Sequence, residues 1–294
     1  MYQDHSARPL LIAIFGMALL CSMDAVVKGM PAGTPTLQIV CLRFLATGAL
    51  LGIWLAIARP GWPRRATLGI HALRAVTMVL AATTFFYALA RIPLAELFVI
   101  SLTSPLFIAL FGALFLREGF RARIALAIAV GFGGVLVVAA GDLGRGGGLA
   151  IDPWALGAAI LSPITYGASI VLLRVQSTQE RPEVIVFTQS LLAGFMTAPI
   201  VGFDFVPLDL NLAVRFAAVG LLGASGYICF ARALSMTTAG RFSVIEYTSL
   251  IWATLFGYAF FNEIPRPAVW LGAVLIIGAC VMVMRDKAAT PAKA

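Results

Sequence analysis

The stretch SVIEYTSLIWATLFGYAFFNE, Ser243 to Glu263, is almost entirely apolar but contains a carboxylate, Glu246, close to its start. Moved back by 145 positions, it aligns without gaps on FVISLTSPLFIALFGALFLRE, Phe98 to Glu118. Both copies contain Leu-Phe-Gly followed at the same spacing by Phe and Glu, a match that apolar composition alone rarely produces. We therefore infer that the chain arose by an internal duplication.

The composition of the chain requires a lipid environment. Of its 294 residues, 61% are hydrophobic and 12% are charged, and the mean hydropathy is +0.98. Soluble domains have about 45–50% apolar and about 25% charged residues. Apolar runs of about 20 residues are long enough to cross a bilayer as helices, and the alternating pattern of a membrane β-barrel is absent from the sequence. Ten such runs are predicted: 10–30, 36–58, 69–90, 94–116, 122–140, 154–174, 183–203, 212–234, 238–261 and 267–284.

The offset between the two copies predicts how the halves are oriented. It spans five segments, and because five is odd, the second half is expected to cross the membrane in the opposite direction to the first. The predicted fold is an all-α membrane protein with ten transmembrane helices in two inverted five-helix repeats, at residues 1–145 and 146–294. Inverted repeats are typical of secondary transporters. A duplicated bundle with no transport role is the alternative.

The net charge of +8 is explained by its position along the chain. Lys and Arg between the segments are about three times as frequent on the side of the termini, and only Arg43 lies well inside a segment. Cytoplasmic loops carry such an excess. The sequence therefore predicts a multi-pass protein of the cell inner membrane with both termini in the cytoplasm. Its partner is the lipid bilayer, and nucleic-acid binding is excluded.

The cysteines indicate neither a metal site nor a redox site. Cys21, Cys41, Cys229 and Cys280 all lie inside apolar runs, and none forms a CxxC pair. Clustered ligands would be needed for a metal or redox centre, whereas isolated cysteines behave as small buried hydrophobes. We expect no metal and no cofactor.

Four motifs are typical of one family of membrane proteins: MDAVVKGM at 23–30, QIVCLRFLATGALL at 38–51, FFYALARIPLAE at 85–96 and SPLFIALFGALFLREGF at 104–120. With them the chain resembles the EamA branch of the ten-helix drug/metabolite transporter superfamily, including its bacterial aromatic amino acid exporters. The resemblance covers nearly the whole chain. It implies a central site lined by helices 1–4 and 6–9 and braced by helices 5 and 10. CSMDA stands where the family has WGSNF, so the motifs identify the family and not the substrate.

Three charged residues are expected to cluster in the outer half of the membrane. A charge inside the bilayer costs about 2.5–3.5 kcal/mol on insertion scales, which favours pairing or function. At about 1.5 Å per residue, Asp24 and Arg43 lie at a similar depth, roughly 9 Å from the outer edge. Lys28 follows Asp24 by one helical turn. The cluster is either an ion pair that holds helices 1 and 2 together or a gate that binds a substrate carboxylate, for which Arg43 is the better ligand.

A second charged pair is expected in the inner half. Glu246 lies roughly 10 Å into the bilayer from the inner side. Arg74 of helix 3 is at a similar depth, and Arg232 and Arg241 are close in sequence, so each is a candidate partner. An ion pair between helices is one interpretation. Proton coupling or binding of a substrate amine is the other.

Polar and aromatic residues in the segments are candidates for lining a cavity. Aromatic faces can stack on an apolar substrate, although plain helix packing explains each residue equally well. Tyr166 is the strongest candidate, because it follows Pro163 near the middle of its helix, and Pro105 is expected to interrupt helix 4. Breaks in helices 1, 4 and 6 would serve as hinges. The candidates are Tyr87, Ser101, Thr103, Tyr166, Tyr227, Tyr247 and Trp252.

One motif raises an enzyme alternative. GASGY, Gly223 to Tyr227, fits the GxSG pattern of rhomboid intramembrane proteases and would make Ser225 a nucleophile. A serine nucleophile needs a base, normally a histidine on a later helix, but His5 and His71 both precede it. We expect no enzyme, and small residues that let helices pack closely explain the motif better.

The charges inside the segments limit the substrate class. A phosphorylated substrate would need several cations in the cavity, and a dicationic amine would need several acids. A small zwitterionic or uncharged molecule fits best. The sequence predicts a secondary transporter that works by alternating access and exports aromatic or hydrophobic amino acids. The alternative is transport of another solute, such as a purine, a riboflavin-like metabolite or a drug. The oligomeric state is left open, a monomer included.

Overall fold

The computed structural model describes residues 8–31, 33–58, 67–115, 122–140, 152–177, 179–236 and 247–288. Within those ranges the secondary structure is all helical, with no strand. The helices are α1 (Arg8–Lys28), α2 (Thr36–Ala58), α3 (Leu68–Leu89), α4 (Leu94–Ser101), α5 (Ser104–Phe115), α6 (Ala122–Ala139), α7 (Pro153–Ser177), α8 (Pro182–Val201), α9 (Leu210–Met236), α11 (Thr248–Phe261) and α12 (Pro267–Ala288).

The ten predicted membrane segments coincide with these helices. Seven spans are long and apolar enough to cross a membrane, namely α1, α2, α3, α4 together with α5, α7, α8 and α9. Shorter apolar helices in α6, α11 and α12 account for the other three segments. The ninth predicted segment is described only from residue 247 onward. The all-α, ten-segment membrane fold predicted from the sequence is confirmed.

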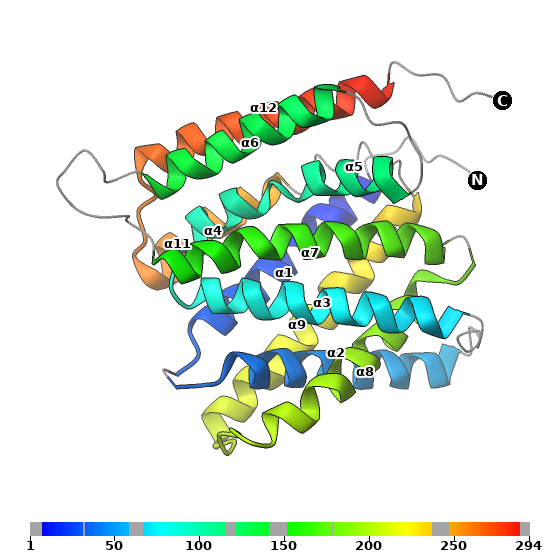
Figure 1. The fold of residues 1–294 in the computed structure, drawn as a ribbon. Coiled ribbons are helices and arrows are strands. Elements are labelled where there is room, and N and C mark those ends of the chain that lie inside the picture. Colours follow the sequence, from blue (N-terminus) through cyan, green and yellow to red (C-terminus); the bar gives the residue numbers. More distant parts are fainter. Residues whose placement is uncertain are drawn as a thin grey trace.

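The helices lie lengthwise beside one another and form an elongated bundle (Figure 1). α1 begins and α12 ends at the same end, on the right in Figure 1, which we call the terminal end. α3 begins and α7 ends there too, whereas α1 ends and α4 begins at the other end, which we call the opposite end. These two ends carry different polar contacts, described below.

The outside of the bundle is apolar. Large side chains in the middle of helices point outward, including Ile53 at 61%, Leu136 at 64% and Phe195 at 66% exposure. Exposed apolar surface on this scale marks a membrane or partner contact, and the length of the helices matches a bilayer. The lateral surface is therefore the lipid-facing surface of a membrane protein.

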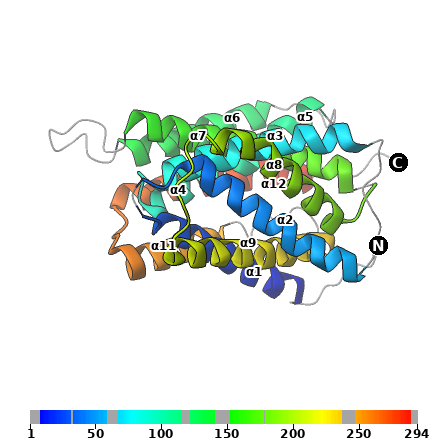
Figure 2. The same ribbon diagram turned by 90° about the horizontal axis from the view of Figure 1, so that it is seen from below.

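Each of the four most extensive helix pairs joins one half of the sequence to the other. α1 packs along α9, α2 along α8, α3 along α7, and α6 along α12. α6 and α12 lie side by side at one edge of the bundle in Figure 1, and Figure 2 shows α1 and α9 together along another edge. The fifth and tenth segments thus pack on each other at the periphery.

Glycines permit the closest of these contacts. A Cβ on Gly134 of α6 would lie 2.9 Å from the carbonyl oxygen of Gly272 in α12, and a Cβ on Gly272 would lie 2.8 Å from that of Gly134. In α9, a Cβ on Gly226 would lie 2.8 Å from Leu20 Cγ of α1. Small residues at helix crossings let backbones approach closely in membranes. The GASG segment therefore contributes to helix packing, as predicted.

The fourth membrane segment is interrupted between α4 and α5. Pro105 has no N–H to donate to the carbonyl of Ser101, so the helical hydrogen-bond ladder is broken there. The Ser104 hydroxyl donates to the Ser101 carbonyl instead, and the Cys280 thiol donates to the Leu102 carbonyl over 3.4 Å. The predicted interruption of helix 4 is confirmed, and side chains satisfy its freed carbonyls.

The breaks predicted in helices 1 and 6 are wrong. α1 is continuous from Arg8 to Lys28, and α7 is continuous through Pro163. An internal proline removes one hydrogen bond. α7 packs along both α3 and α5, and these contacts stabilise it as a continuous helix. Of the three expected hinges, the described residues support only the one in helix 4.

Candidate functional site

A cavity of about 180 Å³ lies among residues of α1, α2, α3, α4, α5, α7, α9 and α11. Neither α6 nor α12 contributes to its lining, which agrees with a bracing role for the fifth and tenth segments. α8, the seventh segment, was expected to line the site, but contributes no lining residue. Much of the wall is apolar, from Met17, Met23, Met78, Phe85 and Phe98.

Arg43 is the cation of this cavity. It is 5% exposed, and its Nη2 donates to Tyr227 Oη over 2.7 Å. The guanidinium carbon lies 5.1 Å from the ring centre of Phe86, 5.2 Å from that of Phe44 and 5.5 Å from that of Tyr227. Such cation–π contacts stabilise a desolvated guanidinium. Its Nε has no acceptor among the described residues, so a donor remains for an anionic ligand.

Asp24 supplies the opposite charge. It lies on α1, is 8% exposed, lines the same cavity and interacts electrostatically with Arg43. Within the described part of the chain, its carboxylate has neither a hydrogen-bond nor an ion-pair partner at contact distance. A buried carboxylate without a direct partner is costly. It can therefore accept hydrogen bonds from a cationic group of a ligand.

Hydroxyl groups complete the polar part of the wall. The Ser101 hydroxyl donates to the Leu97 carbonyl over 2.9 Å, and the Ser162 hydroxyl donates to the Ala81 carbonyl over 3.1 Å. Each hydroxyl proton is thus engaged, and the oxygen lone pairs remain as acceptors. Tyr166 also lines the cavity. Among the described residues, the wall combines a cation, an anion and acceptor oxygens with an apolar and aromatic surface.

The structure brings five of the predicted residues to one place. Asp24, Arg43, Ser101, Tyr166 and Tyr227 all line the cavity. They lie on α1, α2, α4, α7 and α9, which belong to five of the membrane segments that were expected to enclose a central site.

Other candidates lie outside the cavity wall. The ring of Tyr87 is covered by the Arg91 guanidinium at 3.7 Å, and Thr103 donates to the Ile100 carbonyl over 2.8 Å. Trp252 stacks on Phe256, with ring centres 6.0 Å apart.

Tyr247 precedes α11 as its N-cap residue and packs against the buried core. Arg74 is buried and interacts electrostatically with Tyr166 and Tyr227. It lies one turn before the cavity residue Met78 on α3. Glu246 lies outside the described residues, so its pairing with Arg74, Arg232 or Arg241 stays a prediction.

Lys28 differs from the expectation. The sequence placed it with Asp24 and Arg43, but its Nζ lies 2.7 Å from Glu263 Oε1 and donates to the Ile92 carbonyl over 2.6 Å. As the last residue of α1, it reaches the loop before α12. The three residues therefore do not form one cluster. Asp24 and Arg43 line the cavity, whereas Lys28 makes a separate contact at the opposite end of the bundle.

Sequence reasoning missed two groups of polar contacts at the ends of the bundle. One joins Arg266 to Glu96 at the opposite end, and another joins His71 to Glu180 at the terminal end. Glu263 was noticed only as the repeat partner of Glu118. No local pattern signals these pairs, because their members are separated by more than 100 positions.

Comparison with known proteins identifies the same family twice along the chain. The profile of the EamA-like transporter family matches residues 7–140 and again residues 153–285. A solved crystal structure superposes on 97% of the chain with a TM-score of 0.62 and 20% sequence identity, and 99% of that structure is covered. At this identity the likeness shows the fold alone.

Several characterised transporters are similar over most of their length. The pseudopaline exporter CntI of Pseudomonas aeruginosa is 30% identical over 280 residues, which cover 94% of this chain and 96% of that protein. A riboflavin transporter of Rhizobium johnstonii is 29% identical over 79% of this chain and 74% of that protein. An S-adenosylmethionine uptake transporter of Rickettsia bellii is 24% identical over 73% of this chain and 72% of that protein.

Proposed function

The chain belongs to the EamA-like transporter family, and from this premise we propose that it exports small zwitterionic metabolites, with aromatic or hydrophobic amino acids as the first candidates. It is a multi-pass membrane transporter of the drug/metabolite superfamily, and an inner-membrane location agrees with its bacterial relatives. One observation carries the substrate class: Asp24 and Arg43 line a single cavity whose wall is otherwise made of apolar, aromatic and hydroxyl side chains.

The cavity matches the parts of an amino acid. The planar guanidinium of Arg43 can bind a carboxylate at two points, and the Asp24 carboxylate can accept hydrogen bonds from an ammonium group. Phe85 and Phe98, whose ring centres lie 5.8 Å apart, offer a surface for an apolar side chain. Drug-sized ligands occupy pockets of about 300 Å³ or more, so a cavity of about 180 Å³ suits a smaller solute.

Alternating access by two inverted halves, 1–145 and 146–294, is the proposed mechanism. A twofold axis between the two halves would exchange the first segment, α1, with the sixth, α7, and the third, α3, with the eighth, α9. The pairing of α1 with α9 and of α3 with α7 agrees with that exchange. Ser104 and Ser249, equivalent positions in the two copies, both line the cavity. The repeated family match supports the same division.

Export in particular is supported by the relative that matches 94% of the chain and is named an exporter. Transport of a larger aromatic metabolite is the second candidate, favoured by the similarity to a riboflavin transporter. The excess of Lys and Arg on one side supports a cytoplasmic location for both termini.

Counterflow in proteoliposomes tests the substrate. Vesicles loaded with unlabelled phenylalanine should accumulate labelled phenylalanine from outside. Arg43→Gln should lower the rate by roughly tenfold or more, because a hydrogen bond to a charged group is worth about 1.5–3 kcal/mol. Arg91→Gln is the matched control, since Arg91 is exposed and lies on the ring of Tyr87 outside the cavity.

The charge partner is tested in the same assay. Asp24→Asn should also lower the rate, and Asp204→Asn, at an exposed position, should not. Absence of counterflow for phenylalanine, tryptophan and leucine in folded protein would reject the amino-acid assignment. Counterflow of riboflavin or pseudopaline would then establish a different substrate for the same family.

A further inference from the structure

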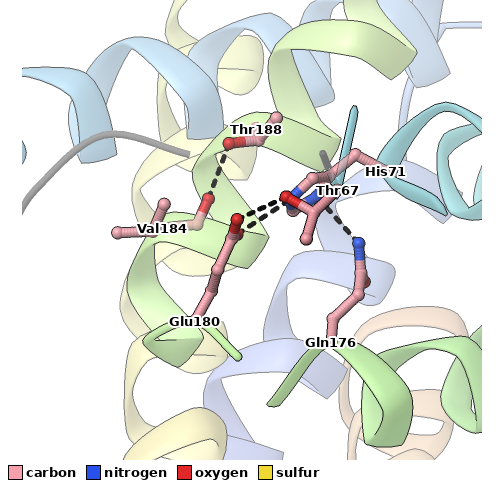
Figure 3. Close-up of polar contacts among 6 residues, drawn as sticks. All are labelled: Thr67, His71, Gln176, Glu180, Val184 and Thr188. Atoms are coloured by element: carbon pink, nitrogen blue, oxygen red, sulfur yellow. Dashed lines mark hydrogen bonds and ion pairs between the residues drawn. The ribbon is translucent and has the colours of Figure 1, made fainter. Parts of the chain in front are cut away.

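A buried polar cluster joins α3 to the turn between α7 and α8 at the terminal end of the bundle. Its members are Thr67, His71, Gln176 and Glu180, and Figure 3 shows their side chains converging. Thr67 Oγ1 donates to Glu180 Oε1 over 2.5 Å, His71 Nε2 lies 2.8 Å from Glu180 Oε2, and Gln176 Nε2 lies 2.9 Å from His71 Nδ1. The His71 side chain is 0% exposed and that of Glu180 is 5% exposed.

The hydrogen-bond partners of the His71 ring fit its neutral form. Gln176 Nε2 is a donor, so the His71 Nδ1 that faces it accepts and carries no proton. The proton of the neutral imidazole is therefore on Nε2, which donates to the Glu180 carboxylate. Gln176 Oε1 is buried and has no donor among the described residues.

A second protonation state requires only a local change. If the Gln176 amide turns over, its Oε1 faces His71 Nδ1 and can accept a hydrogen bond from a proton on that nitrogen. The ring is then an imidazolium, and its Nε2–H still donates to Glu180. That hydrogen bond then joins two charged groups, whereas with the neutral ring only its acceptor is charged. The protonated cluster therefore holds α3 to the α7–α8 turn more tightly than the neutral one.

Histidine is the side chain whose ordinary charge change lies closest to neutral pH. Several other charged residues of the described part lie on elements packed against α3. They are Arg174 of α7 and Arg181 and Glu183 at the start of α8, while Arg74 lies one turn further along α3. Asp24, Lys28, Arg43 and Glu96 of α1, α2 and α4 lie at the cavity or at the opposite end.

The two helices that the cluster joins also line the cavity. α3 contributes Met78, Ala81 and Ala82, and α7 contributes Ser162 and Tyr166. Separating α3 from α7 at the terminal end would open the cavity toward that side. The hydrogen bonds between α3 and the α7–α8 turn lie at the terminal end, away from the cavity, where they can control access to it.

We propose that the Thr67–His71–Gln176–Glu180 cluster is a proton-binding site that controls opening of the transport path at the terminal end. One proton from the aqueous phase on that side adds to His71 Nδ1 and holds the end closed. Its release weakens the contact with Glu180 and lets α3 and α7 separate. The proposal rests on the transporter function of the family, but not on the identity of the substrate.

Cys21 provides a substrate-independent reporter of this opening. Its thiol is 0% exposed and lines the cavity, so a membrane-impermeant maleimide reaches it only when one end opens. In a chain with Cys41, Cys229 and Cys280 replaced by serine, labelling is measured with the reagent on the side of the termini. The same measurement is made in His71→Gln, which keeps a hydrogen-bonding amide but cannot take up a proton near neutral pH.

The ratio of the two labelling rates isolates the cluster, because the pH dependence of the thiol itself cancels. Linkage to one proton changes an equilibrium by at most tenfold per pH unit. The ratio of the unmodified to the His71→Gln rate should fall by roughly tenfold as the pH on that side is lowered from 8 to 6. Reagent on the other side should give a ratio that does not fall as the pH is lowered, because the two ends open in turn in alternating access.

Two outcomes would overturn the proposal. A ratio constant within about twofold over this range would mean that the cluster binds no proton in the gating step. Faster labelling of His71→Gln at every pH by the same factor would show a purely mechanical contact. If His71→Gln does not fold, Glu180→Gln replaces it, since it removes the carboxylate with almost no change in shape. Loss of amino-acid counterflow would leave this measurement unaffected.

Discussion

The two ends of the bundle are closed by different chemistry. At the opposite end, Lys28 Nζ lies 2.7 Å from Glu263 Oε1, and the backbone N–H of Leu94 donates to Glu263 Oε2 over 2.7 Å. Arg266 donates to Glu96 beside them. At the terminal end, His71 and Glu180 are joined inside a cluster of hydrogen bonds that also includes Thr67 and Gln176.

The difference lies in exposure and in the kind of charge. The side chains of Lys28, Glu263 and Arg266 are 11%, 20% and 27% exposed, whereas those of His71 and Glu180 are 0% and 5% exposed. Partly exposed ion pairs are screened by salt, and a histidine changes its charge near neutral pH. We infer that the opposite end responds to ionic strength and the terminal end to pH.

Removal of Arg266 is expected to have the largest effect, because Arg266 pairs with Glu96, whose side chain is 3% exposed. Arg266→Gln should destabilise the folded protein by about 3 kcal/mol, because removing one member of a buried ion pair is strongly destabilising. Thermal unfolding in detergent measures the change. The double variant Glu96→Gln with Arg266→Gln should recover part of the loss. Equal unfolding temperatures for the single and double variants would contradict the assigned pairing.

Removal of Lys28 should open the opposite end selectively. Lys28→Met leaves Glu263 without its cation and removes the donor to the Ile92 carbonyl. Labelling of Cys21 from the side away from the termini should rise by roughly tenfold, as expected for a loss of about 1.4 kcal/mol. Arg91→Met, an exposed change at the neighbouring turn, should have no effect. A rise from the side of the termini instead would show that the two ends are not independent.

The Thr67 hydroxyl donates a hydrogen bond to Glu180 in the terminal cluster. Thr67→Val should cost about 1 kcal/mol and therefore raise Cys21 labelling from the side of the termini by roughly fivefold at a fixed pH. Thr84→Val is the matched control on the same helix, because the Thr84 hydroxyl bonds only to carbonyls of its own helix. Identical Cys21 labelling rates for both variants would show that the Thr67 hydrogen bond does not help to close the terminal end.

The smallest expected effect is a difference between the two ends in how Cys21 labelling responds to salt. Raising the ionic strength from about 0.01 M to about 1 M shortens the Debye length from about 30 Å to about 3 Å. Labelling of Cys21 from the side away from the termini should rise by about twofold to threefold, while labelling from the other side stays constant. A greater salt effect at the terminal end would reverse the assignment of the two ends.

The sequence predicted the membrane segments closely, because each depends on a local property. The second segment, 36–58, matches α2 at both boundaries, and Pro105 correctly located the interruption of helix 4. Pro163 gave the same signal but lies within a continuous α7. A proline removes a hydrogen bond in either place, and the packing of the neighbouring helices decides whether the helix separates there.

The candidate site was predicted in part. Asp24 and Arg43 were singled out because charges inside a membrane segment are costly, and both line the cavity. Tyr87 and Trp252 have the same residue types as Tyr166 but lie in other contacts. Residue type does not show which face of a helix meets the cavity, because the segments are apolar on all sides.

The sequence by itself determined the ten-segment membrane fold, the duplication and the charged residues that the bilayer makes costly. These follow from composition, run length and internal alignment, which are properties of the chain alone. The tertiary structure decided that Lys28 contacts Glu263 and not Asp24, and that His71 meets Glu180. A helix brings together residues three or four positions apart, whereas these partners become neighbours only when helices from the two halves pack side by side.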